Sequence, residues 1–262
     1  MSNLTRGVLT SSLLQRDVSY SLIIPDGYST SARRYPTLYL LHGLFGSFEN
    51  WIDLTNLSEH ARGHDLIIVM PDGADGWYTD SSNGGYYESY LIEELLPEID
   101  KLFMTISDRG NRAIAGNSMG GYGSIKFALK FPELFAFAGS FSGAFHAPRL
   151  NFGGRGASSE ELGPSVMKIF GDDHSRCRIE NDLINLAESA VKKDVELPHV
   201  YFDCGLNDEF LLANRELSKT FSHLGIIHDY REFEGGHDWN YWDLRLGNLI
   251  EMVARKQYST SR

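Results

Sequence analysis

A pentapeptide near the middle of the chain, the G-x-S-x-G pattern at 116–120 (GNSMG), has a spacing that suits a nucleophile. It follows a short apolar run at 112–115 and opens a stretch predicted to be helical. A strand that turns sharply into a helix strains its central serine, and side chains two residues to either side would collide, so Gly116 and Gly120 are required. The turn lifts the hydroxyl of Ser118 beside a helix N-terminus, which favours a developing negative charge. The pattern predicts a nucleophilic serine at position 118.

A serine hydroxyl is a weak nucleophile until a base takes its proton, and the base needs an acid that orients it. With this turn, serine, acid and histidine follow in that order, and functional groups lie beyond the carboxyl ends of parallel strands. His237 follows the last predicted strand, 228–233, at this end. His64 and His199 instead precede strands, and His146 precedes the acid in the chain. We expect His237 to be the base.

Asp208 is the expected acid because it follows the predicted strand 199–203 at its carboxyl end. Asp203 is still inside that strand and should point into the sheet, and Glu209 is the fallback. Asp208 also precedes a helical stretch at 209–224, and aspartate is favoured as a helix N-cap. The sequence alone does not separate these two roles of Asp208.

An acyl-transfer site also needs N–H donors for the oxyanion of its transition state. One donor is the backbone N–H of Met119, the residue after the serine, and the second comes from a loop that follows an earlier strand. That loop is 41–47 (LHGLFGS), and we expect the N–H of Leu44 to be its donor. His42 in the same loop is interpreted as a residue that braces the turn.

Short, mostly apolar runs bounded by turn residues mark the strands that must position these groups. They lie at 18–24, 37–41, 66–70, 112–115, 134–140, 199–203 and 228–233. Predicted helical stretches alternate with them at 88–103, 119–130, 209–224 and 239–255. Such runs are typical of strands buried on both faces of a parallel sheet, and the alternation predicts an α/β fold. We expect a single α/β domain over residues 1–262, with a mostly parallel sheet and helices on both faces.

The stretch 143–197 interrupts this alternation because it holds no clear strand and contains a glycine-rich run at 153–156. It is interpreted as a cap-like insertion over one edge of the sheet, placed before the last two strands. Its polar part, 153–161, lacks the broad apolar face that a lipase lid would bury. This composition favours soluble esters with short acyl chains over emulsified lipid.

Composition and charge limit the partners of the chain. Its 24 basic and 35 acidic residues give a formal charge of −11, which disfavours nucleic acid and anionic membranes. No apolar run approaches the length of a membrane span, no signal peptide is evident, and two cysteines make no disulfide framework. These features predict a cytoplasmic protein and are compatible with a homo-oligomer. With the acyl-transfer site described above, the expected partner is a small-molecule ester. The sequence has no H-E-x-x-H motif, Cys/His cluster or phosphate-binding loop, so we expect neither a metal nor a cofactor.

Several segments occur in an order that carries a resemblance. They are YLLHG at 39–43, MPDG at 70–73, WYTD at 77–80, GNSMGGYG at 116–123, CG at 204–205 with Asp208, and GHDW at 236–239. This ordered set resembles the esterase D/antigen 85-like branch of the α/β-hydrolases. That branch includes tributyrin, feruloyl and acetylxylan esterases and S-formylglutathione hydrolases.

The resemblance implies a serine carboxylesterase that acts on short-chain or sugar-linked acyl esters through an acyl-enzyme. It carries the triad and the oxyanion donors of the branch onto residues already singled out, namely Ser118, Asp208, His237, Leu44 and Met119. A thioesterase of the S-formylglutathione hydrolase type and an acyltransferase use the same triad and stay as alternatives. Formylglutathione hydrolases usually carry a Thr-Cys pair just after the Gly-Leu of the oxyanion loop, where this chain has Phe45 and Gly46. This departure favours the carboxylesterase.

Aromatic residues near the predicted strand ends are the candidates for substrate contact, namely Phe45, Trp77, Tyr78 and Trp239. Side chains of this kind can line an acyl pocket or stack on a sugar. They are equally at home in a protein core, because each buries a large apolar area. The sequence leaves both interpretations open for each of them.

Overall fold

The computed structural model describes residues 3–81, 83–150, 157–172 and 174–256. For residues 3 and 157–161 it describes the backbone alone. Its strands are β1 (Asn3–Ser11), β2 (Arg16–Ile24), β3 (Thr37–Leu41), β4 (Ile67–Pro71), β5 (Asp80–Ser81), β6 (Gly85–Tyr86), β7 (Arg112–Asn117), β8 (Phe137–Phe141), β9 (His199–Gly205) and β10 (His228–Phe233).

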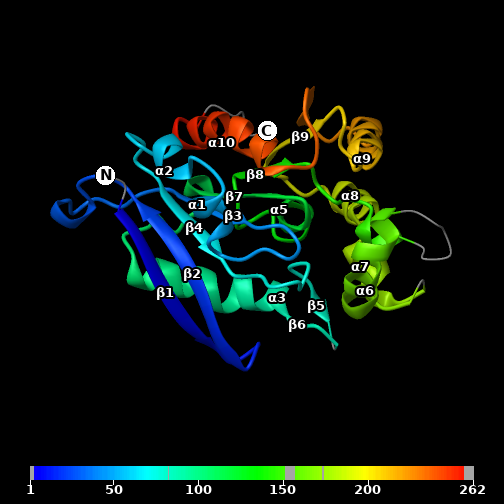
Figure 1. Cartoon of the computed structure of the whole chain (residues 1–262), viewed down its shortest axis with the longest axis horizontal. Coiled ribbons are helices and arrows are strands. Elements are labelled where there is room, and N and C mark those ends of the chain that lie inside the picture. The colour runs from blue at the N-terminus through cyan, green and yellow to red at the C-terminus, as the bar shows by residue number, and fades with distance from the viewer. Residues whose placement is uncertain (1–2, 82, 151–156, 173, 257–262) are drawn as a thin grey trace.

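The central sheet has the strand order β1-β2-β4-β3-β7-β8-β9-β10 (Figure 1). The strands from β4 to β10 in this order pair in parallel, whereas β2 pairs antiparallel with both β1 and β4. β5 and β6 form a separate two-stranded ribbon. The predicted α/β class with a mostly parallel sheet is confirmed.

The main helices are α1 (Asn50–Asp53), α2 (Leu57–His60), α3 (Tyr87–Ser89), α4 (Leu96–Leu102), α5 (Met119–Lys130), α6 (Ala157–Phe170), α7 (Arg176–Asn181), α8 (Leu183–Lys192), α9 (Leu211–His223) and α10 (Trp239–Ala254). A π-helical segment, η2 (Tyr90–Leu95), joins α3 to α4, and short 3₁₀ turns occur at η1 (Tyr28–Thr30), η3 (Arg109–Asn111) and η4 (Ala147–Arg149). The helical stretches predicted at 88–103, 119–130, 209–224 and 239–255 are therefore confirmed.

Two layers of helices cover the sheet, because successive side chains of a strand point to opposite faces. In β3, Leu38 and Leu40 pack with α1, α2 and α10 on one face. Tyr39 and Leu41 pack on the other face, in the core that includes η2, α4, α5, α8 and α9. Burial on both faces explains why the central strands are apolar throughout.

The segment 143–197 lies between β8 and β9, before the last two strands, as expected. Its last helix, α8, packs against α5 and α9 as part of the layer that covers the sheet. α6 and α7 lie beyond that layer, at the right of Figure 1. The glycine-rich run at 153–156 and the side chains of the polar stretch 153–161 lie outside the described residues, so the argument drawn from their composition stays a prediction.

The sequence analysis assigned no strand to β1. This strand pairs with β2 in an unbroken register from Asn3 to Ser11, but it lies at the edge of the sheet and Val8 is 62% exposed. An edge strand needs no continuous apolar run, so it lacked the signal used for the others. β8 begins at Phe137 rather than at 134, because a turn precedes it in which the N–H of Leu134 bonds to the carbonyl of Phe131.

Candidate active site

Ser118 lies at the turn between β7 and α5, with backbone angles φ 53° and ψ −115°. A positive φ is uncommon for a residue with a side chain and stores strain. A Cβ on Gly116 would lie 2.6 Å from the Gly120 backbone, and a Cβ on Gly120 would lie 2.5 Å from the carbonyl oxygen of Leu41. Both glycines are needed for this turn, as the spacing of the pattern implies.

The structure brings together the side chains of Ser118, His237 and Asp208 from three segments far apart in the sequence. Nε2 of His237 lies 3.0 Å from Oγ of Ser118. Nδ1 of His237 lies 3.0 Å from Oδ2 and 3.2 Å from Oδ1 of Asp208. This hydroxyl–imidazole–carboxylate row is the arrangement that lets an imidazole take the serine proton and a carboxylate orient the imidazole.

His237 lies in the loop between β10 and α10, and its side chain is 23% exposed. Two aromatic rings meet it edge-on: Phe210, with ring centres 4.8 Å apart, and Trp242, with ring centres 5.0 Å apart. Packing on two sides fixes the plane of the imidazole. The remaining exposure is what a group that exchanges protons with substrate or water requires.

The Asp208 side chain is fully buried. Burial alone would raise the pKa of its carboxyl, but His237, the hydroxyl of Ser142 and the N–H of Phe210 outweigh burial and lower it. Asp208 is not the N-cap of α9, because the cap position is Phe210. The sequence left open whether Asp208 caps a helix or orients His237, and the structure is consistent with the second role.

Among the described residues, none of the alternative acids and bases forms a side-chain hydrogen bond with Ser118 or His237. Asp203 is buried within β9, where its carboxylate accepts hydrogen bonds from the hydroxyls of Tyr201 and Tyr241 rather than from His237. Glu209 is exposed and lines the same cavity as Ser118 and His237, and the ring of His146 is tilted against that of Phe210 with ring centres 5.2 Å apart.

The loop after β3 lies against the serine turn. A Cβ on Gly43 would lie 3.4 Å from the Cβ of Ser118. Leu44 is the next residue and borders the same cavity as Ser118, and Met119 is the first residue of α5. The first N–H groups of a helix have no intrahelical acceptor. Both expected oxyanion donors therefore belong to segments that meet at the serine, and their role stays a prediction.

His42 braces this loop, as interpreted from the sequence. Its Nε2 accepts the N–H of Gly73 at 2.9 Å, so its Nδ1 carries the proton and donates to the carbonyl of Gly43 at 2.7 Å. The N–H of Phe45 is also held, by Oδ1 of Asp75 at 2.8 Å. Groups from the segment after β4 thus bind the loop on both sides of Leu44.

A cavity of about 340 Å³ opens beside Ser118 and His237. Much of its wall is apolar, with side chains from Phe45, Leu54, Leu162, Phe210, Trp239 and Trp242. Phe45 and Trp239 thus lie where a substrate would contact them. Leu162 comes from α6, so the segment 143–197 contributes to the wall.

The other two aromatic candidates for substrate contact need correction. Trp77 is 0% and Tyr78 1% exposed, and neither lines this cavity. Trp77 packs edge-on against Tyr122 and Phe170, and its indole N–H bonds to Oγ of Ser165. Both residues belong to the core beneath the site. Proximity to a strand end did not distinguish the cavity wall from the layer below it.

The sequence analysis also missed residues that border the site. Trp242 could have been found, because it stands one helical turn after Trp239 in a helix that begins just after His237. Phe210 follows Asp208 closely, but nothing in its type predicts that it packs on the imidazole. Leu162 carried no signal in its segment, and neither did Ser142, which follows β8.

Across the described ranges, no group of three or more His, Cys, Asp or Glu side chains is arranged to hold a metal ion. In the same part of the chain, no helix is long and apolar enough to cross a membrane.

Comparison with known proteins gives a consistent result. The model of the family described as “Putative esterase” matches residues 11–254. Esterase Rv1288 of Mycobacterium tuberculosis is 34% identical to the chain over 256 residues, which is 90% of this chain and 55% of that protein. The chain thus spans about half the length of this relative. The acetyl esterase of Caldicellulosiruptor saccharolyticus is 27% identical over 225 residues, covering 84% of this chain and 83% of that protein.

Among solved structures, the fluorophosphonate-binding serine hydrolase FphF of Staphylococcus aureus is 26% identical, with a TM-score of 0.86 over 97% of this chain and 98% of that chain. The S-formylglutathione hydrolase FrmB of the same organism is also 26% identical, with a TM-score of 0.81 over 97% of this chain and 99% of that chain. With a family model that matches most of its length, the chain belongs to the “Putative esterase” family and has the α/β-hydrolase fold.

Proposed function

We propose that the chain is a serine carboxylesterase that hydrolyses short-chain or sugar-linked acyl esters through an acyl-enzyme. The observation that carries this proposal is the hydrogen-bonded row of Ser118, His237 and Asp208, of which Ser118 and His237 line the 340 Å³ cavity. Membership of an esterase family supports the same reaction class.

In the acylation step, Oγ of Ser118 adds to the ester carbonyl carbon while Nε2 of His237 takes the hydroxyl proton. The carbonyl oxygen becomes an oxyanion, and the N–H groups of Leu44 and Met119 are the donors for it. The bond from the carbonyl carbon to the alcohol oxygen then breaks, and His237 gives its proton to that oxygen. The alcohol leaves, and the acyl group stays on Ser118.

In the deacylation step, His237 takes a proton from water as the water oxygen adds to the acyl carbon. The bond to Oγ of Ser118 breaks, the proton returns to Oγ, and the carboxylic acid leaves. Asp208 stays ionised throughout, consistent with its lowered pKa, and stabilises the imidazolium that forms in each step. No redox or metal chemistry is needed for either step.

The size and wall of the cavity support a small acyl group. Its volume lies near the lower end of the range of small-molecule sites. Leu162 of α6 borders it, which supports the interpretation of 143–197 as a cap-like part of a single domain. Relatives of the chain include an acetyl esterase and an endo-1,4-beta-xylanase/feruloyl esterase, which supports acetyl and feruloyl groups as candidate acyl groups.

The proposal is tested by Ser118→Ala, assayed with p-nitrophenyl butyrate. We expect kcat to fall by roughly four orders of magnitude or more while the circular dichroism spectrum is unchanged, because the nucleophile is lost. A serine-directed phosphonate should label wild type at Ser118 and leave the variant unlabelled. Wild-type turnover in folded Ser118→Ala protein would refute the assignment.

The acyl preference is tested with p-nitrophenyl esters of rising length, beside acetylated and feruloylated sugars. We expect the highest kcat/KM from acetyl to butyryl and a decline beyond about octanoyl. A long apolar pocket would instead gain ~0.8 kcal/mol per buried methylene. A higher kcat/KM for palmitoyl esters would show that α6 opens onto a larger apolar surface.

A thioesterase of the S-formylglutathione hydrolase type is the second candidate, and the likeness to FrmB favours it. It predicts faster turnover of S-formylglutathione than of any oxygen ester in the series. An acyltransferase using the same triad predicts that added alcohol or sugar captures the acyl group in preference to water.

A further inference from the structure

A buried ammonium group lies on α5, the helix that begins just after Ser118. The side chain of Lys126 is 0% exposed. A buried charge is costly unless it is paired and hydrogen-bonded, and burial lowers the pKa of Lys126. The steps of ester hydrolysis do not use this lysine, so its presence in the core needs another explanation.

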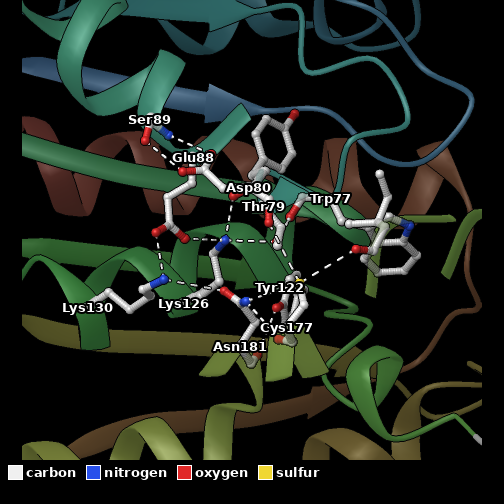
Figure 2. A network of polar contacts seen from close by, with 12 residues as sticks. Trp77, Thr79, Asp80, Glu88, Ser89, Tyr122, Lys126, Lys130, Cys177 and Asn181 are labelled. Carbon is white, nitrogen blue, oxygen red and sulfur yellow. Dashed lines mark hydrogen bonds and ion pairs between the residues drawn. The ribbon is translucent and has the colours of Figure 1, made fainter. Parts of the chain in front are cut away.

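Nζ of Lys126 meets acceptors from two other segments (Figure 2). It donates to the carbonyl oxygen of Tyr78 and to Oγ1 of Thr79, the latter at 2.9 Å, and it forms an ion pair with Oε2 of Glu88 at 2.7 Å. Oε1 of Glu88 accepts a bond from Lys130 at 2.6 Å. Burial would raise the pKa of Glu88, but the two lysines outweigh burial and lower it. The ionised carboxylate holds the ammonium in place against the backbone of Tyr78.

That backbone is strained. Trp77 and Tyr78 both have left-handed conformations, with φ of 52° and 48°. Bulky residues adopt such angles only where their surroundings fix them. Here the indole of Trp77 bonds to Ser165 at 2.8 Å, and the carbonyl of Tyr78 bonds to Lys126. The buried ammonium of Lys126 therefore bonds directly to the backbone of the strained segment, at the carbonyl of Tyr78.

The side chain of Tyr78 connects this strained segment to the oxyanion loop. It fits between two glycines, since a Cβ on Gly123 of α5 would lie 2.8 Å from the ring and a Cβ on Gly73 would lie 2.4 Å from it. Its hydroxyl donates to the carbonyl oxygen of His42 at 3.1 Å. His42 stands two residues before Leu44. A row of contacts therefore runs from Lys126 through Tyr78 to the loop with the second oxyanion donor.

We propose that Lys126 is a positioning residue for the oxyanion loop, which it holds through the backbone and the hydroxyl of Tyr78. The inference rests on the proposed function. Met119 opens α5, and Lys126 lies about two turns further along the same helix. One helix thus positions both oxyanion donors relative to the nucleophile. A displacement of about 1 Å in such a group can cost as much as 10²-fold in rate.

The first experiment compares Tyr78→Phe with Tyr122→Phe. Each change removes one buried phenol hydroxyl that bonds to a backbone carbonyl, that of His42 for Tyr78 and that of Asn181 at 2.8 Å for Tyr122. Only the first of these carbonyls belongs to the oxyanion loop. We expect Tyr78→Phe to lower kcat for p-nitrophenyl butyrate by about tenfold with KM within about twofold, and Tyr122→Phe to leave both near wild type.

A trifluoromethyl ketone provides a readout that loss of stability alone would not move. Ser118 adds to its carbonyl carbon, His237 takes the proton, and the ketone oxygen becomes an oxyanion that needs the same donors. We expect the inhibition constant of Tyr78→Phe to rise by about the factor by which kcat falls. If the inhibition constants of Tyr78→Phe and Tyr122→Phe are equal, or if only KM changes, the proposal is wrong.

The second experiment compares Lys126→Met with Lys130→Met. Both remove a cation from Glu88, but only Lys126 bonds to the backbone of Tyr78. We expect Lys126→Met to lose kcat and ketone affinity together, and Lys130→Met to stay within about twofold of wild type. The double variant with Tyr78→Phe should lose less than the product of the single losses, because both act through one contact. Independent, multiplicative losses would overturn the proposal.

Two results keep this inference separate from the proposed function. If Lys126→Met does not fold, Tyr78→Phe still decides, because an unchanged kcat and inhibition constant in that variant refute the link on their own. If wild type hydrolyses no ester and the phosphonate does not label Ser118, the proposed function fails. An active, labelled wild type with an unaffected Tyr78→Phe variant refutes the positioning role alone.

Discussion

Asp203 and Asp208 stand five positions apart at the carboxyl end of β9, and both carboxylates are buried. Asp203 accepts hydrogen bonds from the hydroxyls of Tyr201 at 2.6 Å and Tyr241 at 2.8 Å. Burial raises the pKa of Asp203 to about 6 in spite of these bonds. Asp208 accepts its bonds from His237 and from neighbouring donors, which lower its pKa in spite of burial.

The two pKa values differ because only one of the two carboxylates has a hydrogen-bond partner that can become positively charged. A tyrosine hydroxyl is a neutral donor, so it only partly offsets the cost of burying a carboxylate. An imidazole can take a proton, and the ion pair that results favours the ionised acid. His237 lines a cavity together with Ser118, so the serine hydroxyl or water can supply that proton. Asp203 instead faces the core around α10. Two identical side chains near one strand end thus have pKa values shifted in opposite directions by their surroundings.

The largest effect that would test this comparison is on turnover. We expect Asp208→Asn to lower kcat by up to about 10⁴-fold, because the amide leaves the imidazole in the wrong tautomer. Asp203→Asn keeps the shape of its site and should change kcat by less than about threefold. The measurement is kcat for p-nitrophenyl butyrate, with folding checked by thermal melts. If Asp203→Asn or Glu209→Gln is crippling and Asp208→Asn is harmless, the acid has been assigned to the wrong residue.

A second effect concerns stability against pH. The pKa of Asp203 rises from its ordinary value of 3.8 to about 6 in the folded chain. Between these values the folded chain binds more protons than the unfolded one. The stabilising contribution of Asp203 is therefore complete below about pH 4 and is lost as pH rises through 6, at a total of ~3 kcal/mol.

This effect is isolated by Asp203→Asn, which cannot titrate. We expect the free energy of unfolding of the variant, minus that of wild type, to increase by ~2 kcal/mol from pH 4 to pH 7 in urea denaturation. Subtracting the wild-type value removes the pH dependence contributed by other carboxylates. One of these is Glu88, whose lowered pKa makes stability fall as pH falls. A difference that does not change with pH would mean that the pKa of Asp203 is the same in the folded and the unfolded chain.

Much of the fold could be predicted because burial on both faces leaves a continuous apolar run in each central strand. The same rule failed for β1, which lies at an edge and is half solvated. The order of the strands across the sheet had no local signal, since β4 lies between β2 and β3 only because of long-range pairing. The apolar pattern within a strand indicates whether the strand is buried, but it does not indicate which strands pair with it.

The triad candidates could be predicted because backbone geometry restricts the residues around Ser118, and chain order restricts the acid and the base. The residues that hold these groups could not. Tyr78 was a candidate for substrate contact or for the core, and it lies in the core, where its hydroxyl donates to the carbonyl of His42. Lys126 carried no signal, because an isolated lysine in a helix usually faces solvent. The role of such residues depends on which segments pack against them, and sequence spacing does not contain that information.

The smallest effect concerns Ser142, whose hydroxyl helps to lower the pKa of Asp208 and accepts the indole N–H of Trp242 at 3.2 Å. Ser142→Ala removes one donor from the carboxylate and keeps a Cβ at the same positive φ of 50°. A hydrogen bond to a charged group is worth about 1.5–3 kcal/mol, but Asp208 keeps its other donors, so we expect kcat to fall by only about tenfold. The control is Ser140→Ala, which removes a buried hydroxyl that has no hydrogen-bond partner among the described residues. Equal kcat values in the two variants would mean that Ser142 fills space beside Asp208 without orienting it.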